Sequence, residues 1–472
     1  PPLICVPVTD YDKLLAQFKP EKAVDGISTI TIAGSKPMHV AKKGNYALVS
    51  PDEDVLKSAL AAKANVAEQL APMSGWIAAQ DIAAVATTAG IKAAVAPMRA
   101  GLAQAKTNFP ANNPQAAQVA AAFDSYDQIL DACEKELTHA AIGLEADHDS
   151  NLHLTSRWMF TANSKFTQFA KSAPAAVKSP FGNLPSLPLA FAFAGPLPKG
   201  IASSFEPMLK ANPQYKSVTP EQWKKINAAL EQMMSATNSI SLVFGVPKEG
   251  GGFFQNFMGV TAVDDSSKFL ETFPKAFQEY LAAYKEAGIP GFENVKITPL
   301  EIGGMKAIQS TIDIMATLPP DSPAETKQTI EKMFGNEGKL MFNYIALGSQ
   351  SILSVTGDAN EAKQKLDLYK ATSEKLADSP LNAKTLGLLS KDAQWVGLVD
   401  LNGFVTMFKG LGNQIDEAHN PFNAAPAFPS MPPLGFSAKA SEQSLDTDLA
   451  LPADTVKAIA AGAQQLMFKG LH

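Results

Sequence analysis

Apolar residues near the start of the chain follow two spacings. Residues 27–32, 38–41 and 46–49 place apolar side chains at alternate positions between Gly- and Pro-containing turns, a pattern typical of antiparallel strands. Residues 11–18 repeat apolar side chains at helical spacing, and acidic residues open a further helix at residues 51–54. The pattern predicts a strand, a helix, a meander of three strands and another helix.

A second group of elements follows. Residues 82–88 predict a strand and residues 90–106 a helix. Residues 115–137 keep one apolar stripe at helical spacing throughout and predict the clearest helix in the chain. Residues 141–147 and 152–160 alternate again on either side of a polar turn, which predicts a hairpin.

Similar elements are predicted beyond a Pro-rich stretch at residues 174–200. Capping boxes, Thr219 with Gln222 and Ser322 with Glu325, mark the beginning of two helices. The predicted elements in this part are strands at residues 189–193, 240–246 and 253–263 and helices at residues 219–234, 267–287 and 322–334.

One stretch of the chain recurs. Residues 5–18 (Cys-Val-Pro-Val-Thr-Asp-Tyr) and residues 260–273 (Val-Thr-Ala-Val-Asp-Asp-Ser) both combine a short apolar strand, acidic residues and a helix with Lys and Phe at matching offsets. Further landmarks recur in the same order, which predicts an internal duplication. The matched segments are 32–34 with 302–304, 49–52 with 355–358, 85–90 with 398–403, and 143–146 with 435–438.

The expected fold class is α+β, because sequential strands joined by tight turns favour antiparallel sheets covered by helices. We expect two tandem repeats, each with a βαβββα-like unit followed by a βα(α)ββα unit. The expected boundaries are residues 1–180 for the first half, 181–238 for a Pro-rich and helical connector, and 239–472 for the second half. Four such units predict an elongated or curved body.

The two predicted halves differ at one sheet edge. The second half has a strand at residues 240–246 before its recurring stretch, whereas the equivalent in the first half would lie before Pro1. Residues 189–193 are therefore a candidate to close that edge.

Composition narrows the class of protein. The chain has 472 residues, 46% of them apolar, a formal charge of −6 and a pI near 5.6, so no basic surface for nucleic acid is expected. Its longest apolar run, residues 187–197, is short and broken by prolines, which predicts a soluble protein with no transmembrane segment. The start at Pro1 predicts either a removed signal peptide, and hence a periplasmic or secreted protein, or a trimmed chain.

The cysteines allow two interpretations. Cys5 and Cys133 both lie within apolar patterns, which favours two buried free thiols. The alternative is one disulfide between the first strand and a distant helix.

The densest polar cluster suggests a metal site. A hairpin turn there would bring two histidines close to carboxylates, ligands that suit Zn²⁺ or Ca²⁺, although these residue types also favour a plain solvated turn. The five residues are Glu145, Asp147, His148, Asp149 and His153.

Other candidate sites have structural explanations. Asp10 and Asp12, echoed by Asp264 and Asp265, resemble paired catalytic carboxylates, but their place before a helix favours N-capping. The glycines at residues 250–252 lack the Lys-Ser/Thr of a phosphate loop, and no cofactor motif is present, so no cofactor is expected.

A Pro-rich loop carries Phe422, Phe428 and Met431. Apolar side chains in such a loop predict contact with a protein or cell-envelope partner, or with an apolar ligand.

The chain resembles a group of exported, internally duplicated proteins with no assigned activity that is typical of planctomycete bacteria. The resemblance is carried by residues 5–15 and by the segment Pro-Leu-Ala-Phe-Ala-Phe-Ala-Gly at residues 188–195. It implies export and duplication, and it implies no catalytic residue.

Three functions remain open. The first is a non-enzymatic binding or structural/assembly component of the periplasm or cell envelope, favoured because no catalytic residues are concentrated in the repeated scaffold. The second is a carrier of an apolar or lipid ligand, which requires an apolar cavity of roughly 300 Å³ or more. The third is a metal-dependent hydrolase built on the cluster from Glu145 to His153.

Overall fold

The computed structural model describes residues 3–18, 20, 23–31, 37–62, 67–108, 116–172, 179–198, 218–248, 251–288, 294–318, 321–416, 420–425 and 428–469. Within these residues, strands form one 4-stranded and one 13-stranded antiparallel sheet, with helices packed on both. The predicted α+β class with antiparallel sheets is therefore confirmed.

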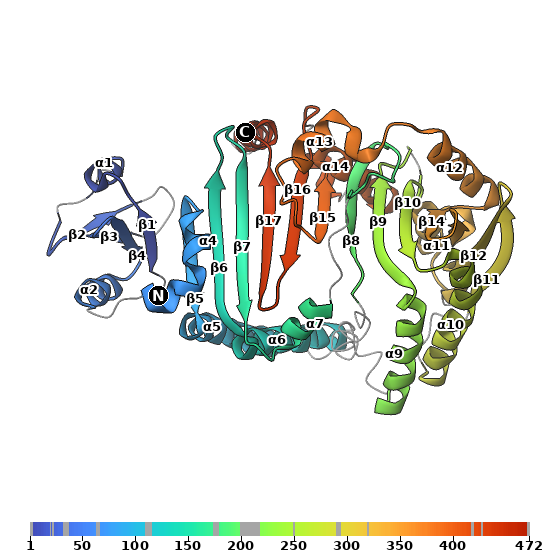
Figure 1. Cartoon of the computed structure of the whole chain (residues 1–472), viewed down its shortest axis with the longest axis horizontal. Helices are drawn as coiled ribbons and strands as arrows, with labels where there is room; N and C mark the ends of the chain where they lie inside the picture. Colours follow the sequence, from blue (N-terminus) through green and yellow to red (C-terminus); the bar gives the residue numbers. More distant parts are fainter. Residues whose placement is uncertain are drawn as a thin grey trace.

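The four-stranded sheet forms a lobe at one end of the elongated molecule (Figure 1). Its strand order is β1-β4-β3-β2, which confirms the predicted meander. Tyr11 packs on one face with Val40, and Leu56 packs on the other with Ala41, so two helices cover opposite faces. The elements are β1 (Ile4–Pro7), α1 (Tyr11–Ala16), β2 (Ile27–Ile30), β3 (Met38–Lys43), β4 (Tyr46–Ser50) and α2 (Glu53–Ala61).

The larger sheet crosses the rest of the molecule in the order β11-β12-β13-β14-β10-β9-β8-β15-β16-β17-β7-β6-β5. Its strands are β5 (Ile82–Thr87), β6 (Leu137–Ala146), β7 (Leu152–Phe160), β8 (Leu189–Pro196), β9 (Thr237–Gly245), β10 (Phe257–Val263), β11 (Val295–Ile302), β12 (Met305–Asp313), β13 (Lys339–Ala346), β14 (Ser351–Thr356), β15 (Trp395–Val399), β16 (Leu434–Ala440) and β17 (Ser444–Leu451).

Helices flank this sheet. They are α3 (Ala67–Leu70), α4 (Ser74–Ala78), α5 (Thr88–Asn108), α6 (Ala116–Glu136), α7 (Lys165–Ser172), α9 (Pro220–Met234), α10 (Ser266–Glu286), α11 (Ala324–Phe334), α12 (Ala359–Ala371), α13 (Pro380–Leu386), α14 (Leu401–Asp416) and α15 (Ala453–Lys469). Short 3₁₀ turns are η1 (Ala71–Met73), η3 (Met315–Thr317), η4 (Asn336–Gly338), η5 (Leu376–Asp378) and η6 (Pro421–Ala424).

Strand β8 lies in the middle of the large sheet, between β9 and β15. The expectation that residues 189–193 close the edge of the first half is therefore wrong. Ala192 pairs with Val243 on one side and Leu398 on the other, and all three side chains belong to the main core. The alanines of β8 fit the crowded core side of the strand, and this accounts for the alternation of Ala and Phe in its sequence.

The main core lies between this sheet and helices α12 and α13. Ile345, Leu353 and Val355 on the strands and Leu366 on α12 are fully buried. Burial of one such side chain stabilises the fold by about 1.5–3 kcal/mol. This core contains residues from Phe181 to Ala450, so it joins the predicted connector to the second half.

Two capping predictions have different outcomes. Thr219 and Gln222 form the predicted capping box of α9. The box predicted at Ser322 is wrong, because α11 begins after Pro323 and no side chain caps it. Of the helices described, none has the length and apolarity needed to cross a membrane.

The cysteines are both free. Cys5 on β1 is exposed and Cys133 on α6 is partly buried, so the prediction of free thiols is confirmed and that of burial is wrong for Cys5. Alternate residues of the short strand β1 face solvent, which accounts for the exposure.

Candidate functional site

Five apolar side chains form a continuous row across five neighbouring strands. Ile82 pairs with Leu144, which pairs with Leu154, then Leu449 and finally Phe436. The strands β5, β6, β7, β17 and β16 that carry them stand side by side (Figure 1). Because strands lie about 4.8 Å apart, the row is about 19 Å long. We call it the apolar row.

Most of the apolar row faces solvent. The exposed fractions are 46% for Ile82, 37% for Leu144, 44% for Leu154 and 39% for Phe436, while Leu449 is partly buried. Ile142, two residues before Leu144 on the same face, is 53% exposed. Single exposed apolar residues are ordinary, whereas this set is contiguous across neighbouring strands.

Residues at even spacing along a strand lie on the same face of the sheet, so the pairing shows what else lies on the face of the apolar row. Ala140 and Trp158 lie on the same face as the apolar row, at even spacing along β6 and β7, and both pack beneath α5 and α6. The helices therefore cover one end of this face and leave the row uncovered at the other.

Residues beside the apolar row carry no charge. One neighbouring row contains Ala84, Ile142, Ser156, Thr447 and Ala438, and the other contains Ala146, Leu152 and Leu451. Ionised groups are absent from all three rows, so an apolar ligand would meet no buried charge there.

Charged side chains lie on the opposite face of the same strands. Arg157 forms a bidentate ion pair with Asp446, at 2.6 and 2.7 Å. His153 places Nδ1 3.1 Å from both oxygens of Asp448. These pairs join β7 to β17, and each satisfies groups that are partly withdrawn from water.

The predicted metal cluster is divided among separate contacts. Asp147 accepts hydrogen bonds from the Asp149 and Asn151 backbone and from the Asn151 side chain, which holds the turn. These bonds lower the Asp147 pKa, the Asn151 side chain having the largest effect.

The other predicted ligands fall into two separate pairs. His148 is exposed and lies 3.3 Å from Asp149, while Glu145 sits opposite His153 across the β6–β7 pair. Nowhere among the described residues do three or more His, Cys, Asp or Glu side chains gather in a group that could hold a metal ion.

The paired aspartates cap helices. Asp10 Oδ1 accepts from Lys13 N at 3.0 Å, and Asp265 Oδ1 accepts from Lys268 N at 2.8 Å. The capping interpretation of these two residues is confirmed. Asp264 instead accepts from the side chain of Asn238.

The Pro-rich loop packs partly on the protein itself. Phe422 stacks on Phe408 of α14, and Asn402 bonds both the N–H and the carbonyl of Phe428. Met431 is buried, with 4% of its surface exposed, whereas Phe422 and Phe428 are partly exposed.

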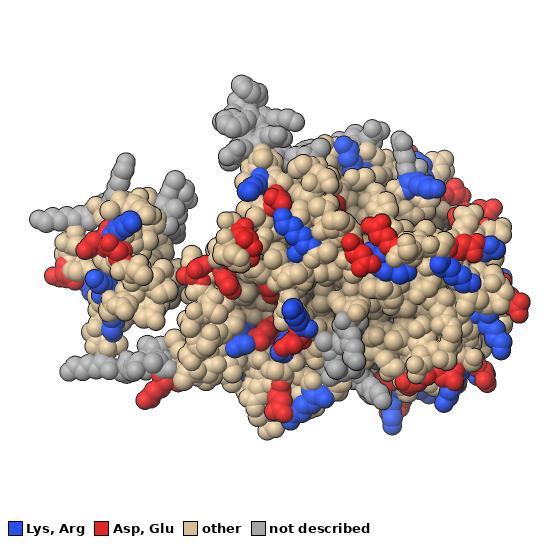
Figure 2. Space-filling view, turned by 45° about the horizontal axis from the view of Figure 1, so that its top comes forward, with Lys and Arg blue, Asp and Glu red and all other residues tan. Residues whose placement is uncertain are grey.

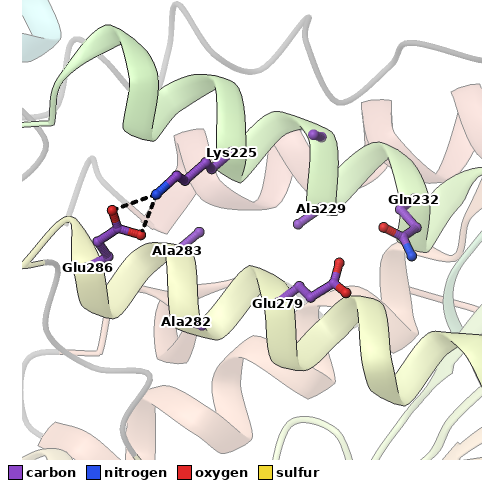
Figure 3. A pocket seen from close by; sticks show the side chains of 8 residues that line it. Lys225, Ala229, Gln232, Glu279, Ala282, Ala283 and Glu286 are labelled. Atoms are coloured by element: carbon purple, nitrogen blue, oxygen red, sulfur yellow. Dashed lines mark hydrogen bonds and ion pairs between the residues drawn. The ribbon is translucent and has the colours of Figure 1, made fainter.

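Two grooves lie between pairs of helices. One, of about 360 Å³, lies between α5 and α6 and has an apolar lining that includes Met98, Leu102, Tyr126 and Ile129. The other, of about 350 Å³, lies between α9 and α10, where the Lys225–Glu286 ion pair spans one end (Figure 3). Both grooves are open to solvent, and only the first lacks charged groups.

One unusual lysine lies away from the apolar row. The Lys365 ammonium on α12 donates to the carbonyl and hydroxyl of Thr356, at 2.7 and 3.0 Å. Burial lowers the Lys365 pKa to about 8, against the opposing effect of Glu361. Lys365 lies between Ala362 and Leu366 on the buried stripe of the helix, and this spacing is the sequence signal for its burial.

The surface in Figure 2 carries acidic and basic residues interspersed, with no large area of one sign on the face shown. Comparison with known protein families, with curated proteins and with solved structures found no match to this chain.

Proposed function

We propose that the protein is a non-catalytic binding protein and that the apolar row binds a ligand with a long acyl chain. The supporting observation is the mostly exposed, uncharged line of Ile82, Leu144, Leu154, Leu449 and Phe436 across the five strands at one end of the large sheet. Side chains on strands are held more firmly than those on loops, which favours a preformed site.

The energetics suit an acyl chain. Each buried methylene contributes about 0.8 kcal/mol, and burial of the row side chains adds to this gain. An acyl chain that lies across the five strands, over about 19 Å, can therefore bury enough methylenes to offset the free-energy cost of association, which is about 4–15 kcal/mol. A shorter ligand would bury too few methylenes.

We further propose that the chain is an internal duplication. By position in the sheet, β1-β4-β3-β2 has a counterpart in β10-β14-β13-β12, and β5-β6-β7 has one in β15-β16-β17. The matched segments 32–34 and 302–304 instead make β12 the counterpart of β3, with β13 as an added strand. In both cases a helix follows the first strand. The equivalent caps at Asp10 and Asp265 support the same relationship.

We also propose export to the periplasm or cell envelope and membership of the planctomycete group. The support is the resemblance carried by residues 5–15 and 188–195. Peptide mass spectrometry of the periplasmic fraction of the native host tests this, and recovery of the protein only from the cytoplasm would contradict it.

The binding function is tested by titrating the protein with a fluorescent long-chain fatty acid. Leu154→Glu places a charge in the middle of the row and should weaken binding at least tenfold, because the carboxylate would lose water against the chain. Ile129→Glu, at a 58% exposed position in the α5–α6 groove, is the matched control. Equal binding by both variants and the wild type would refute the proposed surface.

A further inference from the structure

Two unpaired strand edges face each other in this molecule. Within the part of the chain that the structure describes, β1 pairs with β4 alone and β5 pairs with β6 alone. The two strands lie beside each other where the four-stranded lobe meets the large sheet, without a hydrogen-bonded ladder between them. Each strand therefore has one edge without a ladder partner among the described residues, although Pro7 of β1 has no N–H to offer.

The second half fills the equivalent space with two strands. Under the proposed duplication, β10 and β15 are the counterparts of β1 and β5. Strand β9 pairs with β10, β8 pairs with β15, and β8 and β9 pair with each other. The two strands thus join β10 and β15 into one sheet, whereas β1 and β5 stay in separate sheets.

Two glycines at equivalent positions differ in their surroundings. In α14, a Cβ on Gly403 would overlap the carbonyl oxygen of Leu189 in β8, so the close strand requires glycine there. The matching residue in α5 is Gly90, also the third residue of its helix, where a Cβ would approach only Ala86 Cβ, at 3.4 Å. Glycine costs a helix about 1 kcal/mol relative to alanine, and among the residues that the structure describes no backbone comes close enough to Gly90 to require it.

Side chains near the two glycines show the same contrast. Trp395 on β15 packs closely over Gly195 of β8 and donates from Nε1 to the Pro196 carbonyl. Its counterpart Ile82 on β5 is 46% exposed. Leu411 on α14 is buried with Ala190 of β8, but its counterpart Met98 on α5 is 57% exposed.

The β5 edge also lacks the protection seen at the other end of the sheet. Outer strand β11 carries Lys296, Pro299 and Glu301, residue types that prevent further strand pairing. Strand β5, Ile-Ala-Ala-Val-Ala-Thr, has neither a charge nor a proline. An unguarded edge is suited to accept another strand.

We propose that the edges of β1 and β5 accept a two-stranded β-segment of another polypeptide, whose backbone passes over Gly90 as β8 passes over Gly403. The partner's strand on β5 resembles β8, with small and aromatic residues in alternation. This inference rests on the proposed duplication and gives the binding protein a polypeptide partner in addition to its apolar ligand.

Acceptance of two strands requires the lobe to move. Each added strand takes about 4.8 Å, so β1 would shift from β5 by about 10 Å. The added main-chain hydrogen bonds and the covering of Ile82 and Met98 offset the ordering of the partner segment.

The test uses the full-length protein and a fluorescent peptide with the sequence of residues 188–196, followed by anisotropy and amide hydrogen exchange. Gly90→Ala and Gly101→Ala form a matched pair, because both improve the propensity of α5 and a Cβ at residue 101 meets open space. We expect saturable binding, at least tenfold weaker binding by Gly90→Ala, unchanged binding by Gly101→Ala, and slower exchange of the β5 amides.

Absence of saturable binding, or equal binding by the two glycine variants, would overturn the inference. Binding that persists in Gly90→Ala but disappears in Leu154→Glu would place the peptide on the apolar row. That result would overturn strand addition while supporting the proposed binding surface.

Discussion

His153 and Asp448 connect the two predicted halves, with Nδ1 of the histidine 3.1 Å from both carboxylate oxygens of the aspartate. They lie on β7 and β17, the strands through which β5–β7 join the rest of the sheet. The hydrogen bond to Asp448 raises the His153 pKa above its ordinary value, and burial opposes this effect. The stability of the β7–β17 pairing, which joins the two predicted halves, should therefore depend on pH.

Replacement of His153 by Gln should destabilise the protein more at pH 6 than at pH 8.5. Because the folded-state pKa is raised, its stabilising effect is complete below the ordinary value near 6.5 and is lost as pH rises through the folded value. We expect a loss of about 1–2 kcal/mol at pH 6. Urea unfolding at both pH values measures it, with the exposed His148→Gln as control; an equal loss at both values would contradict the assignment.

The free energy of unfolding of the wild type should rise with pH above pH 8, and the Lys365→Met variant should lack this rise. The folded-state pKa near 8 lies below the ordinary 10.5, so the unfolded chain binds more protons between these values and stability rises with pH there. We expect a rise of about 1–3 kcal/mol in the wild type relative to the variant from pH 8 to 10.5. Parallel stability curves for the two proteins would show that the amine is not desolvated.

Gly403→Ala and Gly90→Ala should have opposite effects on folding. The added methyl at residue 403 overlaps the Leu189 carbonyl oxygen and should cost more than 2 kcal/mol, whereas the methyl at residue 90 should stabilise α5 by about 0.5–1 kcal/mol. Differential scanning calorimetry of the two variants measures this. Similar melting shifts would remove the structural reason for glycine at residue 403.

Removal of the helix cap should lower the free energy of unfolding by a similar amount in each half. Asp10→Ala and Asp265→Ala should each destabilise the protein by about 1 kcal/mol. Each carboxylate accepts a hydrogen bond from the backbone N–H of a lysine in the first turn, Lys13 or Lys268. Asp→Asn at either position should retain most of the stability, since the amide oxygen also caps. Unfolding of the four variants is the measurement, and a cost-free alanine would show that the cap is not needed.

Local patterns were sufficient for many of the elements. Alternation at residues 38–41 and 46–49 indicated the strands of the lobe, and Thr219 with Gln222 indicated the beginning of α9. These features depend on neighbours in sequence, so one chain is enough to detect them.

Long-range pairing was beyond such reasoning. The β7–β17 contact joins residues nearly 300 positions apart, and β8 entered the large sheet rather than the edge of the lobe. The apolar row was also missed, because the alternation of Ile142 and Leu144 reads as a buried face. In the structure Gly143 is buried against Gln80, and the apolar neighbours face solvent.

The most direct test of the proposed function is photo-crosslinking with a diazirine-bearing long-chain fatty acid, followed by peptide mapping. We expect crosslinks to concentrate on residues 142–154 and 436–449, which carry the middle of the apolar row, and Leu154→Glu to abolish them. Crosslinks spread evenly over the surface, or concentrated on α5 and α6 and unaffected by Leu154→Glu, would contradict the proposed function.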